Sequence, residues 1–156
     1  MLIKCSADFI HAIEQDPVRP LDFIGGPLRR FEEPFEVYAL IDKQGFGVVT
    51  HAVVCVAYTW FVPETEEDLL EAAKDPQRGD IVVPYSLWSN QKGAGRKLIN
   101  SLLHALKGQH RVVTMSPKTE QAARFHLGNG ARLLQENEFS NNFEYDTGVA
   151  DGKDNY

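Results

Sequence analysis

The chain has 156 residues and a formal net charge of −6, with 43% hydrophobic and 24% charged residues. This composition is typical of an ordinary soluble domain, and the acidic balance argues against a nucleic-acid partner. No apolar stretch is long enough to cross a membrane and the N-terminus lacks a signal-peptide core, so we expect a cytoplasmic protein without a membrane partner. Cys5 and Cys55 lie far apart, without metal-binding spacing, so no metal site is expected.

The first part of the chain predicts short helices. Residues 6–14 place apolar side chains at helical spacing behind a capping residue, Ser6. Pro17 and Pro20 end this helix, and a second short helix is expected at 28–31, after a Gly-Gly-Pro break.

Two strands and a helix follow. Residues 35–41 are rich in β-forming side chains, and a turn is predicted at 42–45. The strand expected at 48–61 is so apolar that it is typical of a central strand covered on both faces. Thr65 then caps a predicted helix that runs to about Lys74.

The second half alternates strands with helices. A strand is predicted at 80–88, and it contains Pro84, which has no N–H for a regular ladder. We therefore expect a bulge, or a strand that splays from its neighbour. The further predicted elements are a helix at 95–107, a strand at 111–115, a helix at 119–129 and a strand pair at 132–135 and 143–145.

This order of elements predicts an α/β or mixed α+β fold, because helices alternate with sheet strands. A single domain is expected at 1–147, followed by a flexible C-terminal tail at 148–156.

The loop at 90–96, Asn-Gln-Lys-Gly-Ala-Gly-Arg, carries the strongest functional signal. A strand, a glycine loop and a helix in this order build a pocket for anionic oxygen, because the free N–H groups of the first helical turn favour negative charge. The spacing of Gly93 and Gly95 fits neither the Walker pattern nor the Rossmann pattern. A glycine turn with a purely structural role, in an unrelated α/β domain, stays open as an alternative.

The loop resembles the coenzyme A loop of the GNAT superfamily of N-acetyltransferases. The family pattern is Arg or Gln, two residues, Gly, one residue, then Gly or Ala. Gly93 and Gly95 fill the two small positions, and Asn90 stands where Arg or Gln is usual.

A second segment, residues 119–131, resembles a downstream signature of the same family. Ala122, Phe125 and Gly130 match it. The usual Asn, Tyr and Phe are replaced by Thr119, His126 and Ala131. The two signatures lie at the expected separation, with one predicted helix and one predicted strand between them.

The resemblance implies a GNAT-like fold, in which a mixed, mostly antiparallel central sheet is flanked by helices and has a splayed strand pair at the cofactor site. It implies acetyl-CoA as the cofactor and direct attack of a small-molecule or peptide amine on the thioester, in a monomer or homodimer. The implied cofactor-binding residues are Ser86, Leu87, Trp88, Gln91, Lys92, Gly93, Ala94, Gly95, Arg96 and Thr119.

Two residues are candidates for the acid that protonates the departing thiolate. His126 occupies the place of the usual family tyrosine, and as an imidazolium it could donate a proton. Tyr85, on the predicted splayed strand, is the second candidate donor. A packing role stays open for both residues. No general base stands out among Glu36, Glu64, Asp80 and Ser116.

These inferences predict an acetyl-CoA-dependent N-acetyltransferase. The replacements at Asn90, Thr119 and His126 leave an alternative open, a catalytically inactive protein of GNAT fold that binds CoA or has a regulatory role.

Overall fold

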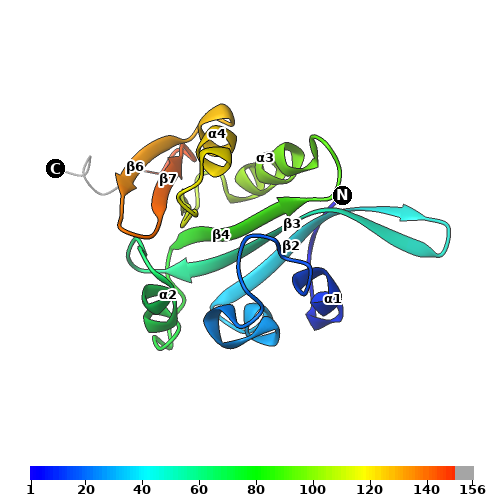
Figure 1. The fold of residues 1–156 in the computed structure, drawn as a ribbon, viewed down its shortest axis with the longest axis horizontal. Coiled ribbons are helices and arrows are strands. Elements are labelled where there is room, and N and C mark those ends of the chain that lie inside the picture. The colour runs from blue at the N-terminus through cyan, green and yellow to red at the C-terminus, as the bar shows by residue number, and fades with distance from the viewer. Residues whose placement is uncertain (150–156) are drawn as a thin grey trace.

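The structure, a computed structural model, describes residues 1–149 and is built around one sheet (Figure 1). Within these residues, seven strands lie in the order β1-β2-β3-β4-β5-β7-β6. Among them, β4 and β5 run parallel, whereas the other neighbouring pairs are antiparallel. The strands are β1 Leu2–Lys4, β2 Phe35–Gln44, β3 Gly47–Thr59, β4 Ile81–Ser89, β5 Arg111–Val113, β6 Arg132–Glu136 and β7 Asn141–Tyr145.

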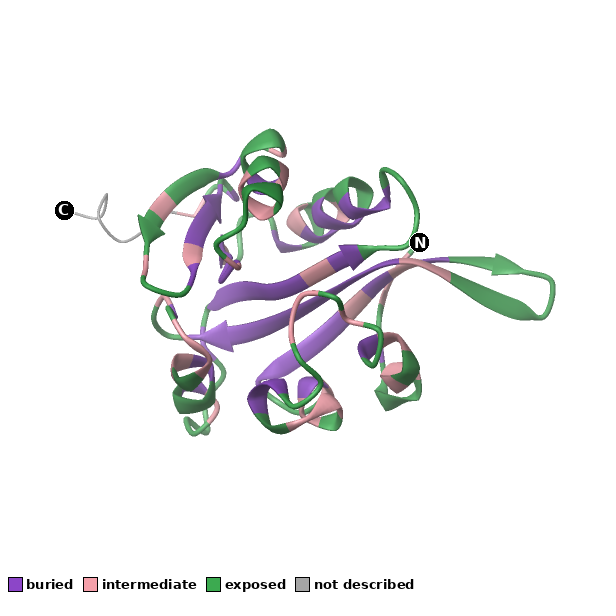
Figure 2. Cartoon of the chain, in the orientation of Figure 1, coloured by how far each residue is buried: buried purple, intermediate pink, exposed green. Residues whose placement is uncertain are grey.

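Helices cover both faces of the sheet (Figure 1). On one face lie α3 (Ala94–Leu106) and α4 (Glu120–Gly128). On the other lie α1 (Ile10–Ile13) and α2 (Glu66–Ala72), together with short 3-10 turns at Ala7–Phe9, Phe23–Gly25 and Pro27–Phe31. Each face of the sheet has its own apolar cluster. The strands β3 and β4 lie between the two clusters and are buried along most of their length (Figure 2). The fold is therefore a mixed α/β fold with a mostly antiparallel sheet, as predicted.

The local signals at the helix starts are confirmed. The Thr65 side chain accepts a hydrogen bond from the N–H of Asp68 at the start of α2, as predicted. Thr119, for which no cap was predicted, accepts one from the N–H of Ala122 at the start of α4. Residues 6–14 form a 3-10 turn followed by one α-helical turn, with Ser6 as the cap. The tail predicted from residue 148 lies outside the described residues from residue 150 onward.

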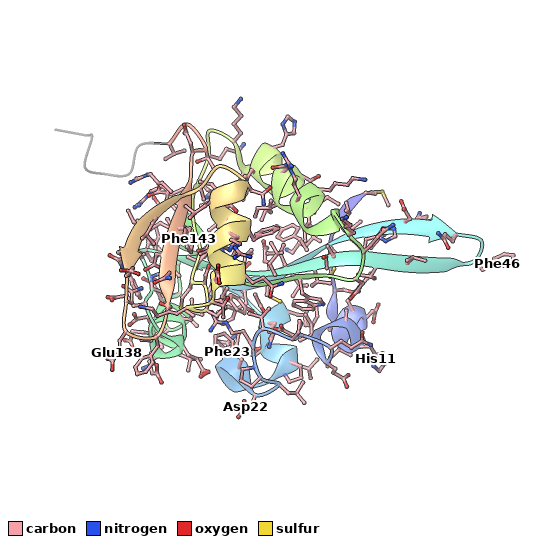
Figure 3. All side chains as sticks on the ribbon, turned by 45° about the horizontal axis from the view of Figure 1, so that its top comes forward. His11, Asp22, Phe23, Phe46, Glu138 and Phe143 are labelled. Atoms are coloured by element: carbon pink, nitrogen blue, oxygen red, sulfur yellow. The ribbon has the colours of Figure 1, made fainter. Side chains whose placement is uncertain are left out.

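The predicted turn at 42–45 is wrong. β2 continues through Gln44, which pairs with Gly47 of β3, and the chain reverses at Gly45 and Phe46. Gly45 has a φ of +61°, which permits this tight turn. The resulting hairpin extends beyond the body of the sheet, and Phe46 lies exposed at its tip (Figure 3).

β4 and β5 part soon after they pair. Their ladder contains Ile81 with Arg111 and Val82 with Val112, and a last bond runs from the Met115 N–H to the Pro84 carbonyl at 2.9 Å. On its other side, β4 carries a bulge, because its register with β3 shifts around Tyr85. The irregular, splaying strand that Pro84 predicted is confirmed.

Gly79, which precedes β4, packs directly on the backbone of β3. A Cβ at this position would lie 2.1 Å from the carbonyl carbon and oxygen of Thr59. We expect Gly79→Ala to lower the free energy of unfolding by about 1–3 kcal/mol, because the strand ends would have to shift. Urea denaturation measures this change. Gly47→Ala, whose Cβ would approach nothing closer than 3.6 Å, is the control, and equal stability of the two variants would contradict the packing.

Candidate functional site

A cavity of about 400 Å³ lies where β4 and β5 part. Its walls come from the C-terminal half of β4, the first turn of α3, one side of α4 and the segments at 17–18 and 115–117. Its lining includes these predicted site residues: Tyr85, Ser86, Leu87, Trp88, Gly95, Thr119 and His126. The other predicted residues follow β4 in the loop and the first turn of α3, beside the cavity: Gln91, Lys92, Gly93, Ala94 and Arg96.

One edge of β4 is open to this cavity. Beyond Pro84, no strand among residues 1–149 pairs with the edge of β4 that faces β5. The Tyr85 carbonyl is bonded instead by a side chain, because Arg19 donates to it from Nε at 2.9 Å. An open strand edge offers backbone donors and acceptors to an extended ligand.

The loop after β4 presents backbone N–H groups. Gly93 is the N-cap of α3, and its φ of +82° turns the chain into the helix. Within the described part of the chain, these residues donate no backbone hydrogen bond: Gln91, Lys92, Gly93, Gly95 and Arg96. The exposed cations Lys92 and Arg96 lie among them. Free N–H groups at the positive end of a helix favour an anion here.

Gly95 keeps the start of α3 close to β4 and α4. A Cβ at this position would lie 3.3 Å from the ring of Phe125 and 3.6 Å from the Leu87 side chain. The small residue therefore lets α3, α4 and β4 meet beside the cavity.

His126 is buried on α4, with 7% of its surface exposed. Its ring stacks on the ring of Phe143, with the two centroids 5.4 Å apart, and its Nδ1 lies 2.7 Å from the hydroxyl oxygen of Tyr145. Burial lowers the pKa of His126 from 6.5 to about 4. Burial therefore favours the neutral ring near pH 7, and the role of His126 as a proton donor stays a prediction.

The Tyr85 hydroxyl does not reach the cavity. The Tyr85 ring packs against the rings of Phe23 (labelled in Figure 3) and Phe35. The centroid of the Tyr85 ring lies 5.5 Å from that of Phe23 and 6.2 Å from that of Phe35. Its hydroxyl oxygen is buried near the Cys55 thiol, and burial raises the pKa of Tyr85 well above 10. Tyr85 lines the cavity, but its hydroxyl is not placed to act as the donor that we expected.

Two other predicted residues have side chains that the fold already uses. The Ser86 hydroxyl donates a hydrogen bond of 2.6 Å to Oδ2 of Asp16, and the Thr119 hydroxyl caps α4. Among the base candidates, Ser116 lines the cavity, and its hydroxyl lies 2.7 Å from that of Thr114. Glu36, in contrast, is ion-paired with Lys4 and Arg78.

Three side chains that complete the site, those of Tyr145, Asp16 and Arg19, were not predicted from the sequence. Tyr145 reaches His126 from β7, while Asp16 and Arg19 reach β4 from the segment after α1. Each of these contacts joins residues far apart in the sequence, so no local pattern indicates them.

No helix within residues 1–149 has the length and apolar character needed to cross a membrane. In the same residues, no group of three or more His, Cys, Asp or Glu side chains could hold a metal ion.

The sequence matches no protein-family model and no curated protein. Solved structures are similar in fold. Malonyl-CoA decarboxylase from Rhodopseudomonas palustris has a TM-score of 0.68 and 17% identity, over 95% of this chain and 60% of that chain. The KacTA–DNA complex has a TM-score of 0.62 and 15% identity, over 95% of this chain and 93% of that chain. AtaTR bound with AcCoA has a TM-score of 0.56 and 15% identity, over 92% of both chains.

These similarities support a GNAT-like fold for this chain. The chain spans about 60% of the length of the decarboxylase chain that it matches. The expectation that nucleic acid is excluded as a partner is wrong, because a structure similar over 95% of this chain is a complex with DNA. A net charge of −6 is a property of the whole chain and does not exclude a local contact.

Proposed function

We propose that the chain binds acetyl-CoA in the cleft between β4 and β5 and transfers the acetyl group to an amine. The observation that carries the proposal is the meeting of three features in one place: the open edge of β4, the cavity beside it and the unbonded N–H groups at the start of α3. The similar structures that carry AcCoA or act on malonyl-CoA support a CoA thioester as the ligand.

The residues present fit this cofactor. The open edge of β4 offers backbone groups to the amides of the pantetheine arm. The N–H groups of residues 91–96 offer donors to the pyrophosphate, and the exposed side chains of Lys92 and Arg96 add positive charge. Gly95 contributes no side chain that would fill the space beside Leu87 and Phe125.

When bound, the cofactor supplies a thioester carbonyl that an amine can attack. A backbone N–H of β4 near Leu87 would hold the carbonyl oxygen as negative charge develops on it. The neutral ring of His126, held at Nδ1 by Tyr145, and the hydroxyl of Ser116 are polar groups of the lining that could carry the proton released by the amine to the departing thiolate, which would leave as the thiol.

A second candidate is a protein that binds CoA without turnover. Burial of His126, which lowers its pKa to about 4, favours this candidate, because a neutral ring is a weaker proton donor to the thiolate than an imidazolium.

Calorimetry followed by a thiol-release assay tests the proposal. We expect saturable binding of acetyl-CoA and thiol release that depends on an added amine, drawn from a panel of small amines and peptides. Binding without thiol release across the panel would support the second candidate. Absence of binding at millimolar acetyl-CoA would contradict both.

Gly93→Val tests the loop. A β-branched residue at a φ of +82° is strained, so we expect the loop to shift and the dissociation constant of acetyl-CoA to rise about ten-fold. The matched control is Gly45→Val, which introduces a similar strain at a φ of +61° in the β2–β3 turn. Calorimetry compares the two variants. The loop assignment fails if both bind acetyl-CoA as tightly as the unsubstituted chain.

A further inference from the structure

The side chain of Arg19 bridges β4 and the segment after β5 at the point where they part. Its Nε donates to the Tyr85 carbonyl at 2.9 Å, and its terminal NH2 group donates to the Met115 carbonyl at 2.7 Å. The last direct bond between the two segments, from the Met115 N–H to the Pro84 carbonyl, lies immediately beside this bridge. Arg19 therefore continues the connection between the two segments after their ladder has ended.

The bridge uses the fixed, forked geometry of the guanidinium. A carbonyl accepts hydrogen bonds and cannot donate one, so the Tyr85 and Met115 carbonyls cannot bond each other. The planar guanidinium presents several N–H groups in a fixed geometry and can satisfy both at once. It thereby replaces a direct ladder bond by a spacer of fixed length.

The segment that carries Arg19 is itself anchored. Oδ1 of Asp16 accepts the N–H groups of Val18 at 2.7 Å and of Arg19 at 3.2 Å, and Oδ2 accepts the Ser86 hydroxyl of β4 at 2.6 Å. The guanidinium carbon also lies 5.1 Å from the ring centroid of Phe23. Because both its backbone and its side chain are held, Arg19 is a rigid spacer rather than a mobile surface residue.

We propose that Arg19 is a positioning residue that sets the separation of β4 and the 115–117 segment and thereby tunes the affinity of the cleft for acyl-CoA. Both segments line the cavity, so a change in their separation changes its width. The effect on affinity rests on the proposed function. The effect on the cleft without ligand does not.

Two measurements on the full chain test the proposal. The first is hydrogen exchange of the Met115 amide without ligand. In Arg19→Met, we expect it to exchange at least about ten times faster, while the Val54 amide in the sheet centre keeps its rate. The second is the dissociation constant of acetyl-CoA, which we expect to rise about ten-fold in Arg19→Met. Arg19→Lys keeps the charge but lacks the forked guanidinium. We therefore expect its Met115 exchange rate and its dissociation constant to lie between those of the unsubstituted chain and those of Arg19→Met.

Two controls separate positioning from general destabilisation. Gly79→Ala weakens the fold away from the cleft, and Arg29→Met removes an arginine that stacks on Phe35, so both should keep the affinity for acetyl-CoA. An unchanged exchange rate of the Met115 amide in both Arg19 variants would contradict the role of Arg19 as a spacer, whether or not the chain binds acetyl-CoA. Faster exchange with unchanged affinity would overturn its role in binding. If the unsubstituted chain fails to bind acetyl-CoA, the proposed function fails, and the exchange measurement alone decides the spacer.

Discussion

Replacing Asp16 by alanine is expected to lower the free energy of unfolding by about 3–5 kcal/mol, because it leaves a buried charge without its partner. The Asp16 side chain is 1% exposed, and its Oδ2 lies 2.6 Å from the guanidinium of Arg30, which is fully buried. The same carboxylate also accepts the Ser86 hydroxyl and the N–H groups of Val18 and Arg19. The substitution thus removes an ion pair and the anchor between the segment after α1 and β4.

Urea denaturation of four variants, Asp16→Ala, Arg30→Met, their combination and Glu71→Ala, checks this prediction. The double variant Asp16→Ala/Arg30→Met removes both charges. We therefore expect its loss in free energy of unfolding to be smaller than the sum of the losses in the two single variants. The control is Glu71→Ala, because Glu71 pairs with Lys74 at 3.0 Å in an exposed position. We expect it to change stability by less than about 0.5 kcal/mol. A similarly small effect of Asp16→Ala would contradict the buried ion pair.

Acidification is expected to destabilise the fold through His126. Burial lowers the pKa of His126 to about 4 in the folded chain, whereas an unfolded histidine titrates near 6.5. Between these two values the unfolded chain binds more protons, so stability is full above about pH 6.5 and falls as the pH is lowered. The loss amounts to about 2 kcal/mol at pH 5 and approaches about 3 kcal/mol below pH 4, an order-of-magnitude figure from the pKa difference.

The free energy of unfolding at about pH 7.5 and at about pH 5 measures this effect. We expect His126→Gln to lose about 2 kcal/mol less on acidification than the unsubstituted chain, because glutamine does not titrate. His11 and His51, which pair with Glu14 and Asp42, are present in both proteins, so their contributions cancel. Equal losses in the two proteins would show that His126 is not held neutral.

The sequence predicts those parts of the fold that depend on neighbouring residues. Thr65 caps a helix through a bond to a residue three positions later, and Pro84 disrupts the strand in which it lies. The turn at 42–45 was misplaced because polar residues there suggested a loop. The structure shows instead that Asp42 and Gln44 pair with β3 in an exposed hairpin.

The candidate site likewise has a part that the sequence predicts and a part that depends on distant residues. Residues 85–96 are contiguous, so a strand, a glycine loop and a helix start were visible in the sequence. The burial that lowers the pKa of His126 arises only in the folded chain, where Tyr145 and Phe143 of β7 pack against the ring. The Tyr85 hydroxyl is buried by Phe23 and other distant groups, so its place could not be inferred from the strand alone.

The central claim is that acetyl-CoA binds in the cleft between β4 and β5. An NMR titration of the backbone amides with acetyl-CoA tests it most directly. We predict saturable shifts at residues 85–96 and around His126, with no change at Phe46 in the hairpin tip. Absence of shifts at millimolar acetyl-CoA, or shifts confined to residues outside the cleft, would contradict the claim.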